Sequence, residues 1–338
     1  MNTASKDFHQ KQLYYRLIAL WVIIEAFAGG IMHGIKIPFS GLILSSMAML
    51  CIILIAYHIT DKNAIIKATI TVAIFKFMLS PHSPGTAYIA LFFQGGLGQI
   101  LFINKKYFSI AAVIFCFLGA VESGIQRLLV LLIVYGNEFW QALNQFIHKV
   151  TGDHNVSNYS MLLAIAYVLT HAIVGVLTGI YGVIIAKGST RWKNEYPELI
   201  IHNIDLINTD LFLAKKIRRK KYNRVFLLCW SILMILYFYP IFFLKASIIP
   251  NNELIKILIR SITIIFVWVM IFSPLAIKFL KKILEKNKIK HRETISAVTK
   301  ILPDTKAIFM ESWKISAQQS GIKRWKLFLK ILIINTIR

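Results

Sequence analysis

Blocks of apolar residues close to the length of a membrane span recur along this chain of 338 residues. Inside a bilayer every backbone N–H and C=O group needs a partner within the protein, so a chain of this kind crosses as helices. Hydrophobic residues make up 57% of the chain and charged residues 16%, whereas roughly a quarter of a soluble domain is charged. The sequence therefore predicts an all-α, polytopic helical membrane protein and excludes a soluble or a disordered chain.

Eight spans are predicted from the apolar blocks. The third is the weakest because it carries Lys67 and Lys76, and the fifth is long enough to be broken or tilted. The spans cover residues 13–30, 37–58, 64–80, 86–103, 108–135, 160–186, 224–244 and 254–280.

The formal net charge of the chain is +24, a value that in a soluble protein would indicate nucleic-acid binding. With eight spans, 32 of the 39 lysines and arginines lie on one side of the membrane and four on the other. Basic residues concentrate on the cytoplasmic side of membrane proteins. We therefore expect a multi-pass protein of the cytoplasmic (inner) membrane, with both termini in the cytoplasm and no nucleic-acid partner.

The chain divides by character into three parts. Residues 1–190 are predicted to form a six-span membrane domain, and residues 191–223 a basic cytoplasmic linker that ends in the run KKIRRKK. Residues 224–338 hold two spans and a basic, amphipathic helical tail with two stretches separated near Pro303. The last stretch, residues 324–338, is too short to span. It either rests on an anionic membrane surface or docks onto a partner.

Charged side chains inside spans cost about 2.5–3.5 kcal/mol each, so each needs a partner or a purpose. Glu122, Gln126 and Arg127 lie in one stretch, VESGIQRLL, and helical spacing places Glu122 and Gln126 on one face. Glu25 and Lys76 are candidates to complete a buried network with them. Two interpretations stay open: an ion-paired bundle that holds the spans in register, or a polar chamber for a ligand.

Three loops on the predicted outer face carry polar and aromatic residues that would cover such a chamber, residues 29–41, 80–88 and 136–158. Glu122 and Arg127 would orient a polar or charged ligand, Tyr88 and Trp140 would cover its apolar body, and His82 would close the outer loop. The predicted substrate-binding residues are Glu122, Gln126, Arg127, Gln94, His82, Tyr88 and Trp140.

No motif of a catalytic or metal site stands in the sequence. The chain lacks the GxxxxGK[ST] phosphate loop and the GxSxG, HExxH, GxGxxG and CxxC motifs. The outer-side histidines, His33, His82, His148 and His154, have no strong ligand spacing. We expect no catalytic residue, no metal and no cofactor.

Small residues recur in the sixth predicted span at Gly175, Gly179 and Gly182. Such a stripe lets another helix approach closely. It indicates either packing within the helix bundle or a subunit interface.

The six-span part resembles the substrate-binding S components of energy-coupling-factor (ECF) transporters. The resemblance rests on its length, its six spans, both ends inside, the first outer loop GGIMHGIKIPFSG and the glycine-rich fourth span. It implies capture of a small micronutrient, vitamin-like or a metal, from the outer face.

The C-terminal part resembles a shortened transmembrane coupling (T) component of the same transporters, over residues 301–325. Ala317 and Gly321 fit an Ala-Arg-Gly docking element, with Ser320 at the position of the arginine. The resemblance implies that separate ABC-type ATPase subunits drive translocation. The predicted partner-binding residues are Ala317, Gly321, Lys323 and Arg324.

The leading hypothesis is therefore a membrane transport protein that is not itself an enzyme and whose partners are a small substrate, ATPase subunits and the lipid bilayer. The alternative is a non-transporting membrane scaffold whose basic tail recruits a cytoplasmic or lipid partner. A third class is an intramembrane enzyme acting on lipid-linked substrates. The sequence does not identify the ligand.

Overall fold

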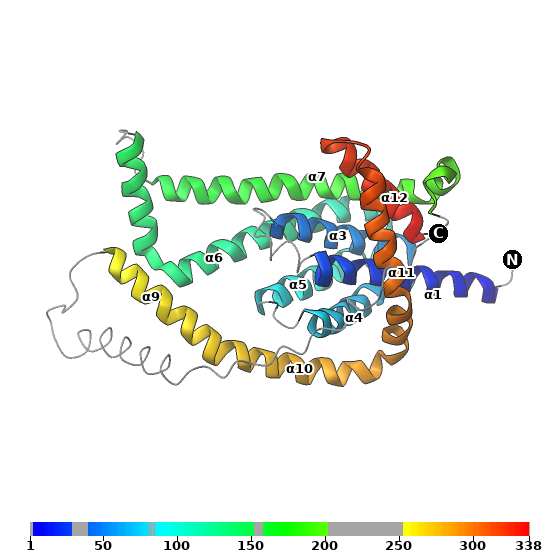
Figure 1. Ribbon diagram of the computed structural model, residues 1–338, viewed down its shortest axis with the longest axis horizontal. Coiled ribbons are helices and arrows are strands. Elements are labelled where there is room, and N and C mark those ends of the chain that lie inside the picture. Colours follow the sequence, from blue (N-terminus) through cyan, green and yellow to red (C-terminus); the bar gives the residue numbers. More distant parts are fainter. Residues whose placement is uncertain are drawn as a thin grey trace. The chain divides into compact units, whose positions relative to one another are not determined.

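The computed structural model describes residues 3–28, 40–80, 83, 85–151, 158–201 and 253–337. Nearly all of these residues are helical, and no strand occurs among them, which confirms the all-α prediction for this part of the chain (Figure 1). The N-terminal helices are α1 (Thr3–Val22), η1 (Ile23–Ala28), α3 (Ser40–His58), α4 (Ala64–Leu79), α5 (Gly85–Leu101) and η2 (Lys105–Tyr107). The later ones are α6 (Phe108–Thr151), α7 (Tyr159–Glu195), η3 (Pro197–Leu199), α9 (Glu253–Val267), η5 (Trp268–Phe272), α10 (Ser273–Lys290), α11 (Arg292–Ser316) and α12 (Gly321–Ile337).

The described helices belong to two compact units. The first unit comprises Met1–Ser123, His171–Ala214 and Leu280–Arg338, and the second comprises Gly124–Thr170 and Lys215–Phe279. This division differs from the three sequential parts of the prediction, because α11 and α12 pack against α1 near the start of the chain. In Figure 1 α11 (orange) lies across α1 (blue).

Within the described residues, four helical segments are long and apolar enough to cross a membrane: Gly41–His58, Lys105–Val150, Tyr159–Glu195 and Ile259–Lys290. Large apolar side chains of α7, such as Ile173 and Leu177, are exposed, as expected for a helix that faces lipid. The chain is therefore a helical membrane protein. The count of eight spans and the side of each terminus stay predictions.

The core of the first unit gathers residues from α1, α3, α4, α5, the first half of α6, and the C-terminal helices. Trp21 and Phe115 are fully buried in it. The core surrounds the inward faces of α4 and α5 and so positions the polar side chains on those faces.

The predicted outer loop at residues 136–158 is wrong for residues 136–151, because α6 continues to Thr151. The helix breaks at Gly136, which has φ 75° and ψ −171°, a conformation that glycine adopts without steric cost. The fifth span is thus long and broken. Residues 137–151 are polar enough to look like a loop, yet contain no proline that would prevent a second helical segment.

The predicted division of the tail near Pro303 is also wrong, since Pro303 lies inside α11. A proline removes one helical hydrogen bond, but Leu302 and Thr305 beside it are buried, and packing of α11 on α1 holds the helix continuous. The break falls instead at residues 317–320. Gly321, with φ 57°, provides the left-handed residue of the turn.

The glycine stripe of α7 packs within the first unit. A Cβ on Gly179 would lie 2.7 Å from Val113 Cα, and a Cβ on Gly175 would lie 2.6 Å from the carbonyl oxygen of Cys116. Both neighbours are backbone atoms of α6, and a backbone atom cannot move away by a change of side-chain rotamer. The stripe therefore lets α7 and α6 approach closely within one chain.

We predict that Gly179→Leu destabilises the protein by about 1–3 kcal/mol, because the added side chain forces α6 and α7 apart. Gly96→Leu is the matched control, since nothing lies within 4 Å of a Cβ at Gly96. The measurement is the melting temperature in detergent, with size-exclusion chromatography as the readout of how much folded protein remains after heating. Equal melting temperatures for the two variants would contradict the packing described here.

Candidate functional site

An ion pair lies inside the first unit between η1 and α4. Lys76 Nζ is 2.6 Å from Glu25 Oε2, and the two side chains are 6% and 14% exposed. Glu25 stands on a π-helical turn, a local widening that is frequent at functional sites. Glu25 and Lys76 therefore pair with each other, and their predicted network with Glu122, Gln126 and Arg127 stays a prediction.

Two predicted ligand residues of α5 lie on its buried face, Tyr88 and Gln94. The ammonium of Lys76 lies 5.7 Å from the centre of the Tyr88 ring, within the range of a cation–π contact. Gln94 Nε2 donates a 2.8 Å hydrogen bond to Ser45 Oγ of α3. Tyr88 stood both in the predicted loop 80–88 and in the predicted span 86–103, and the structure places it in the first turn of α5, which begins at Gly85.

Glu122 of α6 presents a buried carboxylate oxygen, Oε2, that has no hydrogen-bond partner within the described part of the chain. One turn before it, a Cβ added to Gly119 would lie 3.8 Å from Gln94 Cγ. Gly119, one turn before Glu122 on α6, therefore lies close to Gln94 of α5. An unsatisfied acidic oxygen is costly in an apolar interior, and a ligand that donates a hydrogen bond would offset that cost.

We name these six residues the buried polar cluster: Glu25, Ser45, Lys76, Tyr88, Gln94 and Glu122. Five helical elements, η1, α3, α4, α5 and α6, contribute to it. Its ion pair is neutral as a whole, and its amide, hydroxyl and phenol groups can donate and accept hydrogen bonds. These side chains are therefore the hydrogen-bonding groups that this part of the first unit offers to a small polar molecule.

Sequence reasoning did not single out Ser45, because one hydroxyl inside an apolar span carries no pattern. It also left Arg260 of the second unit without a partner. In the structure Arg260 Nη1 lies 3.3 Å from Glu138 Oε2, beside the break at Gly136. Glu138 had been placed in a loop, so the pair could not be foreseen.

The remaining predicted chamber residues are Gln126, Arg127, Trp140 and His82. Gln126, Arg127 and Trp140 belong to the second unit, in which Arg127 is exposed. Trp140 packs edge-on against Phe139, with ring centres 5.5 Å apart. His82 lies outside the described residues.

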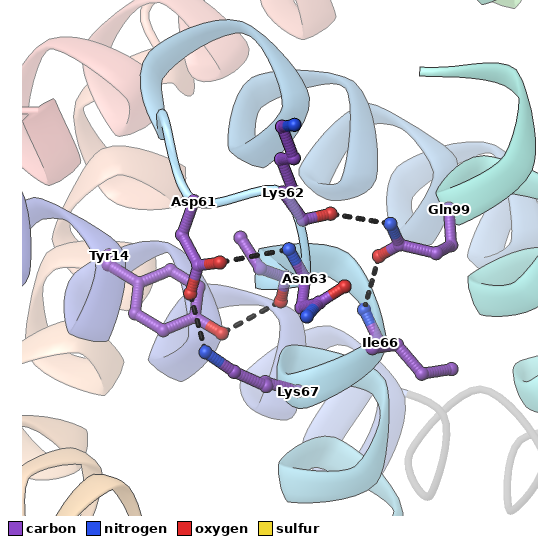
Figure 2. Close-up of polar contacts among 8 residues, drawn as sticks. Tyr14, Asp61, Lys62, Asn63, Ile66, Lys67 and Gln99 are labelled. Atoms are coloured by element: carbon purple, nitrogen blue, oxygen red, sulfur yellow. Dashed lines mark hydrogen bonds and ion pairs between the residues drawn. The ribbon is translucent and has the colours of Figure 1, made fainter. Parts of the chain in front are cut away.

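A second polar region surrounds the short connection between α3 and α4 (Figure 2). The carboxylate of Asp61 accepts hydrogen bonds from Lys67 Nζ at 2.6 Å and from the backbone N–H of Asn63 at 2.9 Å. The hydrogen bond from Lys67 holds the pKa of Asp61 below its ordinary value. The hydrogen bond from Asn63 acts in the same direction with a smaller effect. Both bonds are local and tie down the start of α4.

Two other helices anchor the same connection. The Gln99 side chain donates to the carbonyl of Lys62 and accepts from the backbone N–H of Ile66, as Figure 2 shows. The Tyr14 hydroxyl donates to the carbonyl of Ala64 at 2.7 Å. These hydrogen bonds satisfy backbone groups at and just before the start of α4, so we interpret the region as structural.

Two cavities of the first unit lie away from the buried polar cluster. One, of about 240 Å³, adjoins the α3–α4 connection and includes Lys62 and Lys105 in its wall. The other, of about 300 Å³, lies between α1, α11 and α12 and includes Arg16 and Asp304. The polar groups of Thr305 and Asn335 in its wall are bonded to backbone atoms of the chain itself.

The predicted partner-binding residues cluster at the turn between α11 and α12. Ala317, Gly321 and Lys323 are exposed there. The Arg324 guanidinium lies 4.2 Å from the centre of the Trp313 ring. The structure thus brings together the residues that the sequence grouped, and gives Gly321 a conformational role in the turn.

Among the residues that the structure places, no group of three or more His, Cys, Asp and Glu side chains could hold a metal ion. Of the four outer-side histidines of the prediction, His148 packs edge-on against the ring of Tyr159. His33, His82 and His154 fall outside the described part of the chain.

Comparison of the chain with protein-family models, with curated proteins and with solved structures finds no match. The candidate site therefore rests on the geometry above.

Proposed function

We propose that this protein is a membrane transport protein that binds a small polar solute at the buried polar cluster, taken up from the outer face. The observation that carries the proposal is the acidic oxygen of Glu122, which has no partner among the described residues and stands one turn after Gly119, which approaches Gln94. A buried acidic oxygen without a partner is costly, and a solute that donates a hydrogen bond would offset that cost.

In this proposal each residue of the cluster has a separate task. Glu122 accepts a hydrogen bond from the solute or balances a positive charge on it. Gln94, held by Ser45, offers a fixed amide, and Tyr88 offers a ring face and a hydroxyl. The Glu25–Lys76 pair keeps η1 and α4 together and sets the local field. Separate ATPase subunits in the cytoplasmic (inner) membrane supply the energy for translocation.

We predict that Glu122→Gln abolishes ligand binding and leaves the empty protein at least as stable as wild type, because a neutral amide replaces a buried ionisable carboxyl group. The purified protein is melted in detergent with a panel of water-soluble vitamins and divalent metals. A solute that raises the wild-type melting temperature should not raise that of the variant.

Glu311→Gln is the matched control, since Glu311 pairs with Lys314 on α11 and should leave the ligand response intact. Uptake of the same solute is then measured in cells at matched expression. Wild-type uptake by Glu122→Gln would remove the cluster from the proposal.

The alternative is a membrane scaffold whose basic tail recruits a partner. The exposed basic turn between α11 and α12 favours it. A scaffold would recruit its partner without any solute response in the melting assay, which separates the two functions.

A further inference from the structure

The turn between α11 and α12 exposes apolar side chains in a basic setting. We name residues 313–326 the α11–α12 tip. Ile322 is 76% exposed, Trp325 42% and Trp313 36%. The tip contains four basic residues and no acidic one. The second half of α12, in contrast, is buried within the first unit.

The exposed side chains are held in place by the helices beneath them. Trp313 and Trp325 pack edge to face with ring centres 5.3 Å apart, and each also packs against the buried ring of Phe328. The Arg324 guanidinium stacks over Trp313, and its Nε has no hydrogen-bond partner in the part of the chain that the structure describes. The tip is thus a preformed surface that carries indole rings and positive charge together.

From this surface we infer that the α11–α12 tip binds the anionic headgroups of the membrane, with Ile322 and Trp325 inserted at the boundary of headgroups and acyl chains. Tryptophan collects at that boundary because its ring is apolar and its N–H is polar. Lysines around it gain from the negative potential of the cytoplasmic leaflet. An amphipathic helix with both features binds such a surface.

A protein partner fits the same surface less well. Lysine is depleted in protein interfaces, yet Lys323 and Lys326 flank the exposed Trp325. Arginine binds phosphate through several donors, so Arg324 adds to the attraction of the tip for lipid phosphates. The inference does not depend on solute transport, since it concerns a different surface of the first unit.

The test uses the full chain in nanodiscs of phosphatidylcholine, with or without phosphatidylglycerol. Ile322→Cys carries an environment-sensitive fluorophore, and Ser296→Cys, exposed on α11, carries the same label as a reference. Cys51 and Cys116 are buried, and Cys229 is replaced by serine in both proteins. Quenching by a spin-labelled lipid reports insertion, and quenching by iodide reports exposure to water.

In nanodiscs with phosphatidylglycerol we expect the label at position 322 to be quenched by the spin-labelled lipid and protected from iodide, while the label at 296 stays open to iodide. Lys323→Gln with Lys326→Gln should shift the tip toward the water-exposed state by roughly 30-fold. The matched control, Arg292→Gln with Lys300→Gln, removes two exposed charges of α11 outside the tip and should leave the quenching unchanged.

Three results would overturn the inference. The first is equal iodide quenching of position 322 with and without phosphatidylglycerol. The second is the same loss of protection in the control pair. The third is protection that appears only when purified ATPase subunits are added, without quenching by the lipid. That result would assign the tip to a protein partner.

Discussion

Lys76→Met should destabilise the protein by about 3–5 kcal/mol, because it leaves the Glu25 carboxylate buried without its partner. Replacing both residues, as Glu25→Gln with Lys76→Met, should recover much of that loss, since no buried charge then remains. The measurement is thermal unfolding of the purified protein in detergent, with the yield of monodisperse protein as a second readout.

The same helix offers a matched control. Lys67 of α4 also forms an ion pair, with Asp61 at 2.6 Å, but the two side chains are 45% and 46% exposed. A solvated pair is worth only about 0–1 kcal/mol, so Lys67→Met should change the melting temperature little. Equal effects of the two lysine substitutions would show that Lys76 is not buried in the folded protein.

Phe328→Ala should destabilise the protein by about 3–5 kcal/mol, the usual range for removing a buried aromatic ring. Phe328 is buried, and its ring centre lies 5.3 Å from those of both Phe309 and Trp313. Its loss opens the contact between α11 and α12, and these helices cover α1. Melting temperature and protease sensitivity of the C-terminal helices are the measurements.

Ile322→Ala is the comparison for that variant, because it also truncates an apolar side chain of α12 but at an exposed position. It should melt within a degree or so of wild type, as expected for a surface change. If Phe328→Ala melts alongside it, the C-terminal helices do not contribute to the core. The packing on α1 also means that deleting residues 285–338 would expose that core, so substitutions at the tip separate partner binding from folding more cleanly.

The membrane class and helical architecture of this chain followed from the sequence. Apolar blocks of spanning length allow few alternatives in a bilayer, and the structure contains four such helices among its described residues. The polar positions inside the spans were also visible, since a lysine at position 76 or a glutamate at 122 stands out in apolar surroundings. The eight-span count, the ECF resemblance and the micronutrient substrate stay predictions.

Helix boundaries were harder to predict where a local signal competed with packing. A proline normally ends a helix, yet α11 continues through Pro303 because it packs along α1. The polar residues after Gly136 look like a loop, yet they continue α6. The first error arose because burial on another helix is not written in the local sequence, and the second because polar residues occur in exposed helices as well as in loops.

The tertiary structure alone decided which polar groups meet. The sequence grouped Glu122 with Gln126 and Arg127 by their spacing along one helix, and the structure keeps all three on α6. It paired Lys76 with Glu25, 51 positions away, and Gln94 with Ser45, 49 positions away. Hydropathy and periodicity are properties of neighbouring residues, whereas these contacts depend on which helix faces turn toward each other, and only the packed fold determines that.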